Sequence, residues 1–200
     1  MPNVREFTPQ RVPADFARLV PAFLEIWNAP ENLKYLSLSL RPFEEPIVQG
    51  WFKDHLAAGV RYFAALGERD EILGISVLRS DPVGMHELFA VGVRPGLQRR
   101  GIGSQLISHS LETARSEGFA CTEASVFANN VRMLRLLLSL GFVPFRIDHH
   151  RRADGADLVV LHRRLDEQST PAAGGKSLGG HAIGEAAGAP TPARGSPLKR

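Results

Sequence analysis

The stretch VRPGLQRRGIGSQLISHSLETA, residues 93–114, constrains the fold of this chain more than any other. It follows an apolar run, passes two arginines, and carries two glycines, Gly101 and Gly103, at the start of a helical pattern. Backbone amides at the start of a helix lack partners, and the helix dipole favours an anion there. Glycines remove the side chains that would keep an anion away from those amides. The turn therefore predicts an anion-binding site between a strand and a helix.

The rest of the folded region alternates helical and strand patterns. Helices are expected at 13–28, 44–59, 102–118 and 131–140, and strands at 4–8, 60–66, 71–80, 86–93, 121–127, 142–148 and 156–165. Apolar residues recur at steps of three and four in the helical segments, and turn residues separate the strands. This order predicts an α/β fold of the α+β type. Its central sheet of about seven strands would be mixed and mostly antiparallel, with a parallel pair flanking the helix after the glycine turn.

Composition sets the expected domain boundaries. Hydrophobic residues make up 44% of the chain and charged residues 22%, which is enough for one globular core. We expect that core within residues 3–165. Residues 166–200 are rich in Gly, Ala, Pro and Ser and lack aromatic residues. Such a segment cannot offset the backbone entropy of folding, so it is expected to form a disordered tail.

The same composition disfavours several classes of protein. A net charge of +3 is too small to favour a nucleic-acid partner. No apolar run is long enough for a membrane span, and the N-terminus lacks a signal-like core. The single cysteine, Cys121, excludes an internal disulfide, and no cluster of His, Cys, Asp or Glu has metal-ligand spacing. We therefore expect a soluble, cytoplasmic protein without a metal and without membrane or nucleic-acid partners.

Two common nucleotide-binding motifs fit the glycine turn poorly. Gly96 and Gly101 have the spacing of a Walker loop, but Ile102 and Gly103 stand where that loop needs Lys and Ser or Thr. The third glycine of a dinucleotide fingerprint would fall on Leu106, and no βαβ unit precedes it. A purely structural turn is a further alternative.

The segment QRRGIG, residues 98–103, resembles the Q/R-x-x-G-x-G/A signature of the GNAT superfamily of N-acetyltransferases. The longer stretch FAVGVRPGLQRRGIGSQLI resembles the strand, turn, loop and helix of that superfamily. Downstream, FANNVRMLRLLLSLGFVPF resembles a second family segment, with Asn130, Leu136, Gly141 and Phe142 in the matching places. The resemblance covers essentially residues 4–165.

The resemblance implies an acyl-CoA N-acyltransferase fold, in which two parallel strands splay apart beside the CoA-binding helix, with acetyl-CoA as cosubstrate. Backbone groups of the strand before the turn would pair with the pantetheine arm and polarise the thioester carbonyl, and the turn would bind the pyrophosphate. The implied residues are Val91, Gly92 and Val93 on the strand, and Gln98, Arg99, Arg100, Gly101, Ile102, Gly103 and Ser104 in the turn. Asn130 would either lie near the pantetheine arm or cap the following helix.

Glu87 is the first candidate for the general base that the reaction needs. An alkyl amine with a pKa of about 10.4 must lose a proton before it attacks a thioester. Glu87 precedes Gln98 by eleven residues, an offset that resembles the glutamate of the histone-acetylating branch. Glu123, on the neighbouring strand, is the alternative base. His86 is expected on the opposite face of its strand from Glu87.

Two departures from the family pattern bear on the activity. Leu137 stands where many members carry a tyrosine that protonates the departing thiolate, and Ser125 stands where the branch acting on ribosomal protein N-termini carries a glutamate. Both weigh against a protein N-terminal acetyltransferase.

The leading hypothesis is an enzyme that moves an acetyl group from acetyl-CoA to a primary amine of a small molecule or protein. The alternative is a CoA-binding sensor or interaction module without turnover, and the missing tyrosine motivates it. Glu31, Glu44 and Glu45 would attract a cationic acceptor, or they form a solvated face. Because dimers are common in the superfamily, the resemblance also raises a homodimer.

Overall fold

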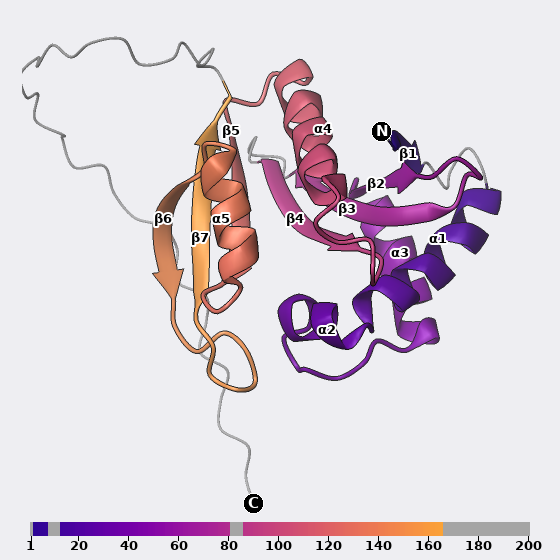
Figure 1. Cartoon of the computed structure of the whole chain (residues 1–200), viewed down its shortest axis with the longest axis horizontal. Coiled ribbons are helices and arrows are strands. Elements are labelled where there is room, and N and C mark those ends of the chain that lie inside the picture. The colour runs from indigo at the N-terminus through magenta and orange to yellow at the C-terminus, as the bar shows by residue number, and fades with distance from the viewer. Residues whose placement is uncertain (1, 8–12, 81–85, 166–200) are drawn as a thin grey trace, which may run out of the picture. The chain divides into compact units, whose positions relative to one another are not determined.

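A computed structural model describes residues 2–7, 13–80 and 86–165 of the 200-residue chain (Figure 1). Its elements are β1 (Asn3–Phe7), α1 (Pro13–Trp27), α2 (Pro30–Leu36), α3 (Glu45–Ala57), β2 (Arg61–Leu66), β3 (Ile72–Ser80), β4 (His86–Val93), α4 (Ile102–Ser116), β5 (Cys121–Phe127), α5 (Val131–Ser139), β6 (Val143–Asp148) and β7 (Leu158–Arg164). The tail expected at 166–200 lies outside the described residues. None of the helices in the described ranges is long and apolar enough to cross a membrane.

One mixed sheet joins these strands in the order β1-β2-β3-β4-β5-β7-β6. Neighbouring strands are antiparallel except β4 and β5, which run parallel because α4 connects them as a crossover. The predicted fold class is confirmed: a mostly antiparallel sheet of seven strands has one parallel pair flanking the helix after the glycine turn.

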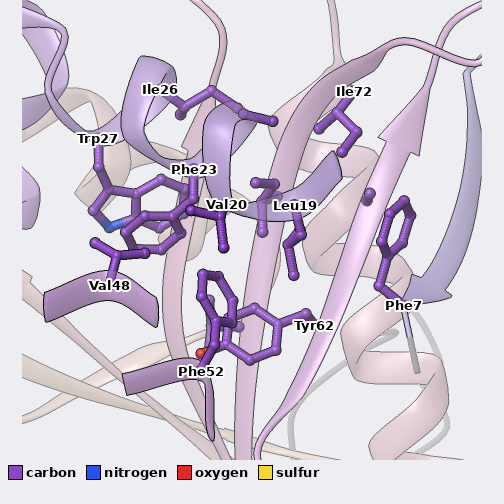
Figure 2. Packing of buried hydrophobic residues seen from close by; sticks show 14 of the residues in the cluster. Phe7, Leu19, Val20, Phe23, Ile26, Trp27, Val48, Phe52, Tyr62 and Ile72 are labelled. Carbon is purple, nitrogen blue, oxygen red and sulfur yellow. The ribbon is translucent and has the colours of Figure 1, made fainter. Parts of the chain in front are cut away.

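Helices α1 and α3 cover one face of the sheet. Their apolar side chains and those of β2 and β3 form a core (Figure 2). Within it, the Phe23 and Trp27 rings stack with centroids 4.0 Å apart, and the Phe52 and Tyr62 rings lie 4.5 Å apart. This packing holds α3 against β2 and sets the position of the residues at the C-terminal end of α3.

Helices α4 and α5 cover the opposite face. The cluster that they share with the sheet contains Leu88, Ile107, Leu111, Ala124, Leu137 and Leu161. Because side chains alternate across a strand, Leu88 faces α4 and Glu87 faces the side of α1 and α3. His86 is buried on the α4 side, with its Nδ1 atom 3.1 Å from Thr122 Oγ1, which confirms that it points away from Glu87.

Strands β4 and β5 pair over only part of their length. The register partners are His86 with Thr122, Glu87 with Glu123, and Leu88 with Ala124. Pairing then ends, although β4 continues to Val93 and β5 to Phe127. The two parallel strands therefore splay, as the resemblance implies, and their inner edges keep backbone groups without a strand partner.

β4 carries a β-bulge on the edge that pairs with β3, next to the point where its pairing with β5 ends. Val77 of β3 faces Ala90, whereas the next residue, Leu78, faces Leu88. Phe89 is therefore the extra residue of β4. A bulge bends a strand and changes the direction of the inserted side chain, so this irregularity accompanies the loss of pairing with β5.

Helix α2 is absent from the elements predicted above. It has 7 residues, begins at Pro30 and buries none of them, so it shows no apolar periodicity. The other predicted elements are present, with ends that differ from the expected ones by no more than two residues.

Candidate functional site

A cavity of about 1140 Å³ opens where β4 and β5 part. Its walls come from the start of α4, both splayed strands, α5, and residues of α1–α3 and β2 on the other face of the sheet. The predicted site residues that line it are Glu87, Val91, Val93, Gln98, Arg99, Gly101, Ile102, Gly103, Ser104 and Asn130. Gly92, Arg100 and Glu123 are not among the lining residues.

The start of α4 presents free backbone amides to this cavity. Gly101 is the N-cap residue with φ of 81°, and no side chain caps the helix. The first helical hydrogen bond runs from the amide of Gln105 to the carbonyl of Gly101, at 3.0 Å. The amides of residues 102–104 therefore precede the helical ladder and can bind an anion. A Cβ atom added to Gly101 would meet only open space, so the approach to these amides is unobstructed.

Two arginines precede this helix start on the surface. Both Arg99 and Arg100 are exposed, and Arg99 adopts a positive φ of 65°. Arg99 lines the cavity and Arg100 does not. Their charges add to the helix dipole, although solvent and salt screen exposed charges.

Gln98 ties two walls of the cavity together. Its Nε2 donates to Asn32 Oδ1 of α2 at 3.0 Å, and its Oε1 accepts from Arg132 Nη1 of α5 at 3.0 Å. Asn32 in turn donates to the carbonyl of Val93 at 2.9 Å. The Gln98 side chain thus holds the glycine turn between α2 and α5.

The edge of β4 that faces the gap to β5 carries the backbone groups of every second residue. The amide of Arg94 donates to Leu73 of β3 at 2.8 Å. Alternate residues direct their backbone groups to opposite edges, so Val91 and Val93 face the gap and Gly92 faces β3. A Cβ atom on Gly92 would lie 2.7 Å from atoms of Ile26 and Trp27. The role of Gly92 in this structure is close packing against α1.

Asn130 caps α5. Its Oδ1 accepts from the backbone amide of Met133 at 3.2 Å, and the residue also lines the cavity. The structure therefore contains the capping arrangement, one of the two alternatives raised by the sequence.

Glu87 lies in the cavity wall on the side of α1 and α3. Its Oε2 accepts from Arg79 Nε at 2.9 Å, and Arg79 Nη2 lies 2.5 Å from the same oxygen. The Glu87 side chain is mostly buried, whereas that of Arg79 is largely exposed. Both contacts engage Oε2. Among the residues that the structure describes, no hydrogen bond engages Oε1.

Glu123 is the register partner of Glu87, but it lies in a different environment. His162 of β7 donates from Nε2 to Glu123 Oε2 at 2.8 Å. The Phe145 ring of β6 stacks on His162, with centroids 4.1 Å apart. This carboxylate is therefore held outside the cavity.

His55 and Tyr62 form a pair that the sequence analysis does not single out. His55 lies in the last turn of α3, and its Nδ1 lies 2.6 Å from the hydroxyl of Tyr62 in β2. Burial lowers the pKa of His55, and the charge of Arg79 lowers it further. Burial also raises the pKa of Tyr62. Both groups are therefore neutral near pH 7, and both line the cavity. Only the packing of α3 on β2 brings them there.

The position of the family tyrosine is apolar here. Leu137 is buried in the cluster of α4 and α5. Within the described part of the chain, no three His, Cys, Asp or Glu side chains gather closely enough to hold a metal ion.

The sequence model of the Acetyltransferase (GNAT) family matches residues 20–142. The chain belongs to this family. The matched segment holds the glycine turn, both splayed strands and the cap of α5.

Individual relatives agree with the family. The chain is 30% identical over 96 residues to the uncharacterized N-acetyltransferase YvbK of Bacillus subtilis, covering 48% of this chain and 61% of that protein. It is 30% identical over 76 residues to the ribosomal protein bS18-alanine N-acetyltransferase of Escherichia coli, covering 37% and 51%. The matches thus span about half to three-fifths of these relatives.

A solved structure shares the fold of this GNAT family member. The phosphinothricin acetyltransferase of Sinorhizobium meliloti, determined in complex with acetyl-CoA, superposes with a TM-score of 0.68 at 17% identity. The alignment covers 87% of this chain and 94% of that one. At this identity, the comparison establishes the common fold.

Proposed function

We propose that residues 3–165 form an acetyl-CoA-dependent N-acetyltransferase that moves an acetyl group to a primary amine. The single observation that carries the proposal is one cavity that joins uncapped amides at the start of α4 to a mostly buried carboxylate, Glu87, on the other face of the sheet. Membership of the GNAT family supports the same activity. The lone cysteine supports a reducing, cytoplasmic location.

The helix start fits the pyrophosphate of CoA. The amides of residues 102–104 would donate to its oxygens, and the absence of side chains at Gly101 and Gly103 lets the phosphates approach. Ser104 lines the same wall, and Arg99 and Arg100 would add positive charge. Gln98 would act by holding the turn in place, since both ends of its side chain are already hydrogen bonded.

The inner edge of β4 fits the pantetheine arm. Val91 and Val93 face the gap left by β5, and an extended ligand can pair with such an edge as an added strand. The carbonyl of Val93 already accepts one hydrogen bond from Asn32, so Val91 is the residue of this edge that we expect to pair with the arm. An amide of this edge would stabilise the negative charge that develops on the thioester oxygen.

Glu87 would accept the proton of the amine. Acetyl-CoA supplies an activated carbonyl carbon. The amine first loses its ammonium proton to Glu87 Oε1, directly or through water, and the neutral nitrogen then bonds to the carbonyl carbon. The C–S bond breaks, the thiolate departs, and the second proton released from nitrogen passes to water. A thiolate with a pKa of about 8.5 is a modest base and can take its proton from water. This route requires no tyrosine at position 137.

The proposal is tested by incubating the protein with acetyl-CoA and a panel of primary amines while following thiol release. Amine-dependent release, together with detection of the N-acetyl product, supports it. Tight CoA binding by calorimetry without amine-dependent release across the panel would instead favour the CoA-binding sensor.

A further inference from the structure

The acceptor side of the cavity has an aromatic wall, made of Phe43, Trp51, His55 and Phe89. Their rings form a continuous series. The Phe43 and Trp51 centroids are 5.4 Å apart, those of Trp51 and His55 are 6.5 Å apart, and those of His55 and Phe89 are 6.3 Å apart. All four side chains line the cavity, and they come from the segment before α3, from α3 itself and from the bulge of β4.

Two rings of the aromatic wall are exposed. Trp51 is 40% exposed and Phe89 is 44% exposed, although large aromatic residues are usually covered in a folded domain. Exposed apolar side chains that gather in a concave site mark a ligand-binding surface. Ile47, on the same helix as Trp51, is also exposed but does not line the cavity. The aromatic wall is thus distinguishable from ordinary exposed residues of α3.

The aromatic wall ends beside the carboxylate proposed as the base. The Arg79 guanidinium lies 5.0 Å from the centroid of Phe89 and is ion-paired with Glu87. Phe89 follows Glu87 by two residues, and the bulge at Phe89 accompanies its ring contact with His55 of α3. A ligand that lies on the Phe89 and Trp51 rings therefore has its end close to Glu87.

The charged side chains near the aromatic wall do not favour binding of a polycationic acceptor. Glu87 is already neutralised by Arg79, and His55 carries no charge near pH 7 because burial and Arg79 lower its pKa. Glu31 lines the cavity together with Lys34. Glu44 and Glu45, the other carboxylates raised by the sequence as attractors for a cation, are not among the lining residues.

We infer that the acceptor is a primary amine carried on a flat aromatic body, which lies against Trp51 and Phe89 while its amino group reaches Glu87. The inference rests on the proposed acetyl transfer and specifies its acceptor class. Aromatic rings pack on one another in offset or edge arrangements that a saturated ring of similar size cannot reproduce. The site should therefore distinguish aromatic from saturated amines of equal length.

The test measures kcat/KM at saturating acetyl-CoA for four amines: 2-phenylethylamine, 2-cyclohexylethylamine, n-butylamine and spermidine. We expect 2-phenylethylamine to exceed butylamine and spermidine by about tenfold or more, and to exceed its saturated analogue by several-fold. Trp51→Ala and Phe89→Leu should each bring the ratio of 2-phenylethylamine to butylamine close to one. Ile47→Ala is the matched control and should keep the wild-type ratio.

A binding measurement separates failure of this inference from failure of the proposed function. Saturation-transfer NMR reports contact between the ring protons of 2-phenylethylamine and the protein in the presence of CoA, without turnover. Turnover of butylamine or spermidine with no aromatic preference, or an equal ratio in Trp51→Ala and wild type, overturns the aromatic acceptor alone. If no amine turns over, the acetyl transfer is wrong, and loss of the ring signal in Trp51→Ala would still support the aromatic site. Absence of that signal in the wild type would overturn the aromatic site, whatever the outcome for acetyl transfer.

Discussion

Glu87 and Glu123 are register partners in the parallel pair of β4 and β5, yet the first carboxylate binds an arginine and the second binds a histidine. Arg79 holds Glu87 at the cavity wall, and His162 holds Glu123 outside it. Parallel neighbours point to the same face of a sheet. The two glutamates that the sequence offers as bases are therefore adjacent, but only Glu87 reaches the space where an amine would bind.

This difference predicts the effect of two matched substitutions. Glu87→Gln preserves size but removes the proton acceptor, so kcat should fall by roughly 10²–10⁴-fold. The affinity for acetyl-CoA should stay unchanged, because the helix start and strand edge bind it. Raising the pH should partly restore the rate, since more amine then loses its proton to solvent. Glu123→Gln, measured in the same pH–rate profile, should change kcat less than about threefold. The reverse ranking would assign the base to Glu123.

The glycine turn predicts a graded pair of variants. A Cβ atom on Gly103 would lie 3.8 Å from Val93 and 4.0 Å from Leu136, which are ordinary contacts, so Gly103→Ala should fold and bind CoA. Gly103→Val adds two methyl groups where the phosphates approach, and should weaken CoA binding by about tenfold or more while the domain still folds. Calorimetric titration with CoA measures the affinity, and circular dichroism checks the fold. Equal affinities in the two variants would count against a phosphate site at this helix.

Two histidines whose pKa is lowered by burial predict how the free energy of unfolding depends on pH. Burial lowers the pKa of both His55 and His86. The unfolded chain therefore binds more protons than the folded chain below the ordinary histidine pKa of about 6.5. The stabilising contribution is complete above that pH and is lost as the pH falls below it.

His86→Asn tests this dependence at one site. An asparagine amide can replace the imidazole nitrogen near Thr122 but does not titrate in this range. Melting temperatures recorded from pH 8 to pH 5.5 should fall less steeply for the variant than for the wild type. His150→Asn controls for the loss of a histidine on the surface. An unchanged slope in His86→Asn would mean that His86 does not contribute to the acid sensitivity.

The contacts of Arg152, in the segment between β6 and β7, predict an effect on stability. Its buried guanidinium binds Asp154 through two hydrogen bonds of 2.8 Å, donates to the carbonyl of Lys34, and lies 4.6 Å from the centroid of the Phe127 ring. Lysine cannot reproduce this planar, multiple contact. Arg152→Lys should lower the free energy of unfolding by about 1–3 kcal/mol in urea titrations. The control Arg151→Lys, at an exposed position, should change it by less than about 0.5 kcal/mol; similar losses in both variants would contradict this account.

Elements with a local sequence pattern could be predicted from the sequence alone. The strand and helix on either side of the glycine turn follow from periodicity, and the parallel pair of β4 and β5 follows from the helix between them. Helix α2 could not be predicted from apolar periodicity, because it is short and buries no side chain. The bulge at Phe89 could not be predicted either, since it depends on how β3 and β4 pair rather than on the residues of one strand.

Only those site residues that belong to a sequence motif could be predicted. The glycine turn and Glu87 follow from a resemblance within one continuous segment. The contacts of Gln98 with Asn32 and Arg132 join segments far apart in the chain, and the contact of His55 with Tyr62 requires α3 to fold back onto β2. Such contacts depend on tertiary packing, and no local pattern in the sequence encodes them.

The most direct test of the proposed acetyl transfer follows the acetyl carbon itself. The full chain is mixed with acetyl-CoA labelled with ¹³C at the carbonyl and with 2-phenylethylamine or butylamine, and the carbonyl resonance is recorded over time. The account predicts that the label moves from thioester to amide at a rate proportional to the protein concentration, and that Glu87→Gln slows this transfer while still binding acetyl-CoA. Label that stays in the thioester, or that appears only in free acetate, would contradict it.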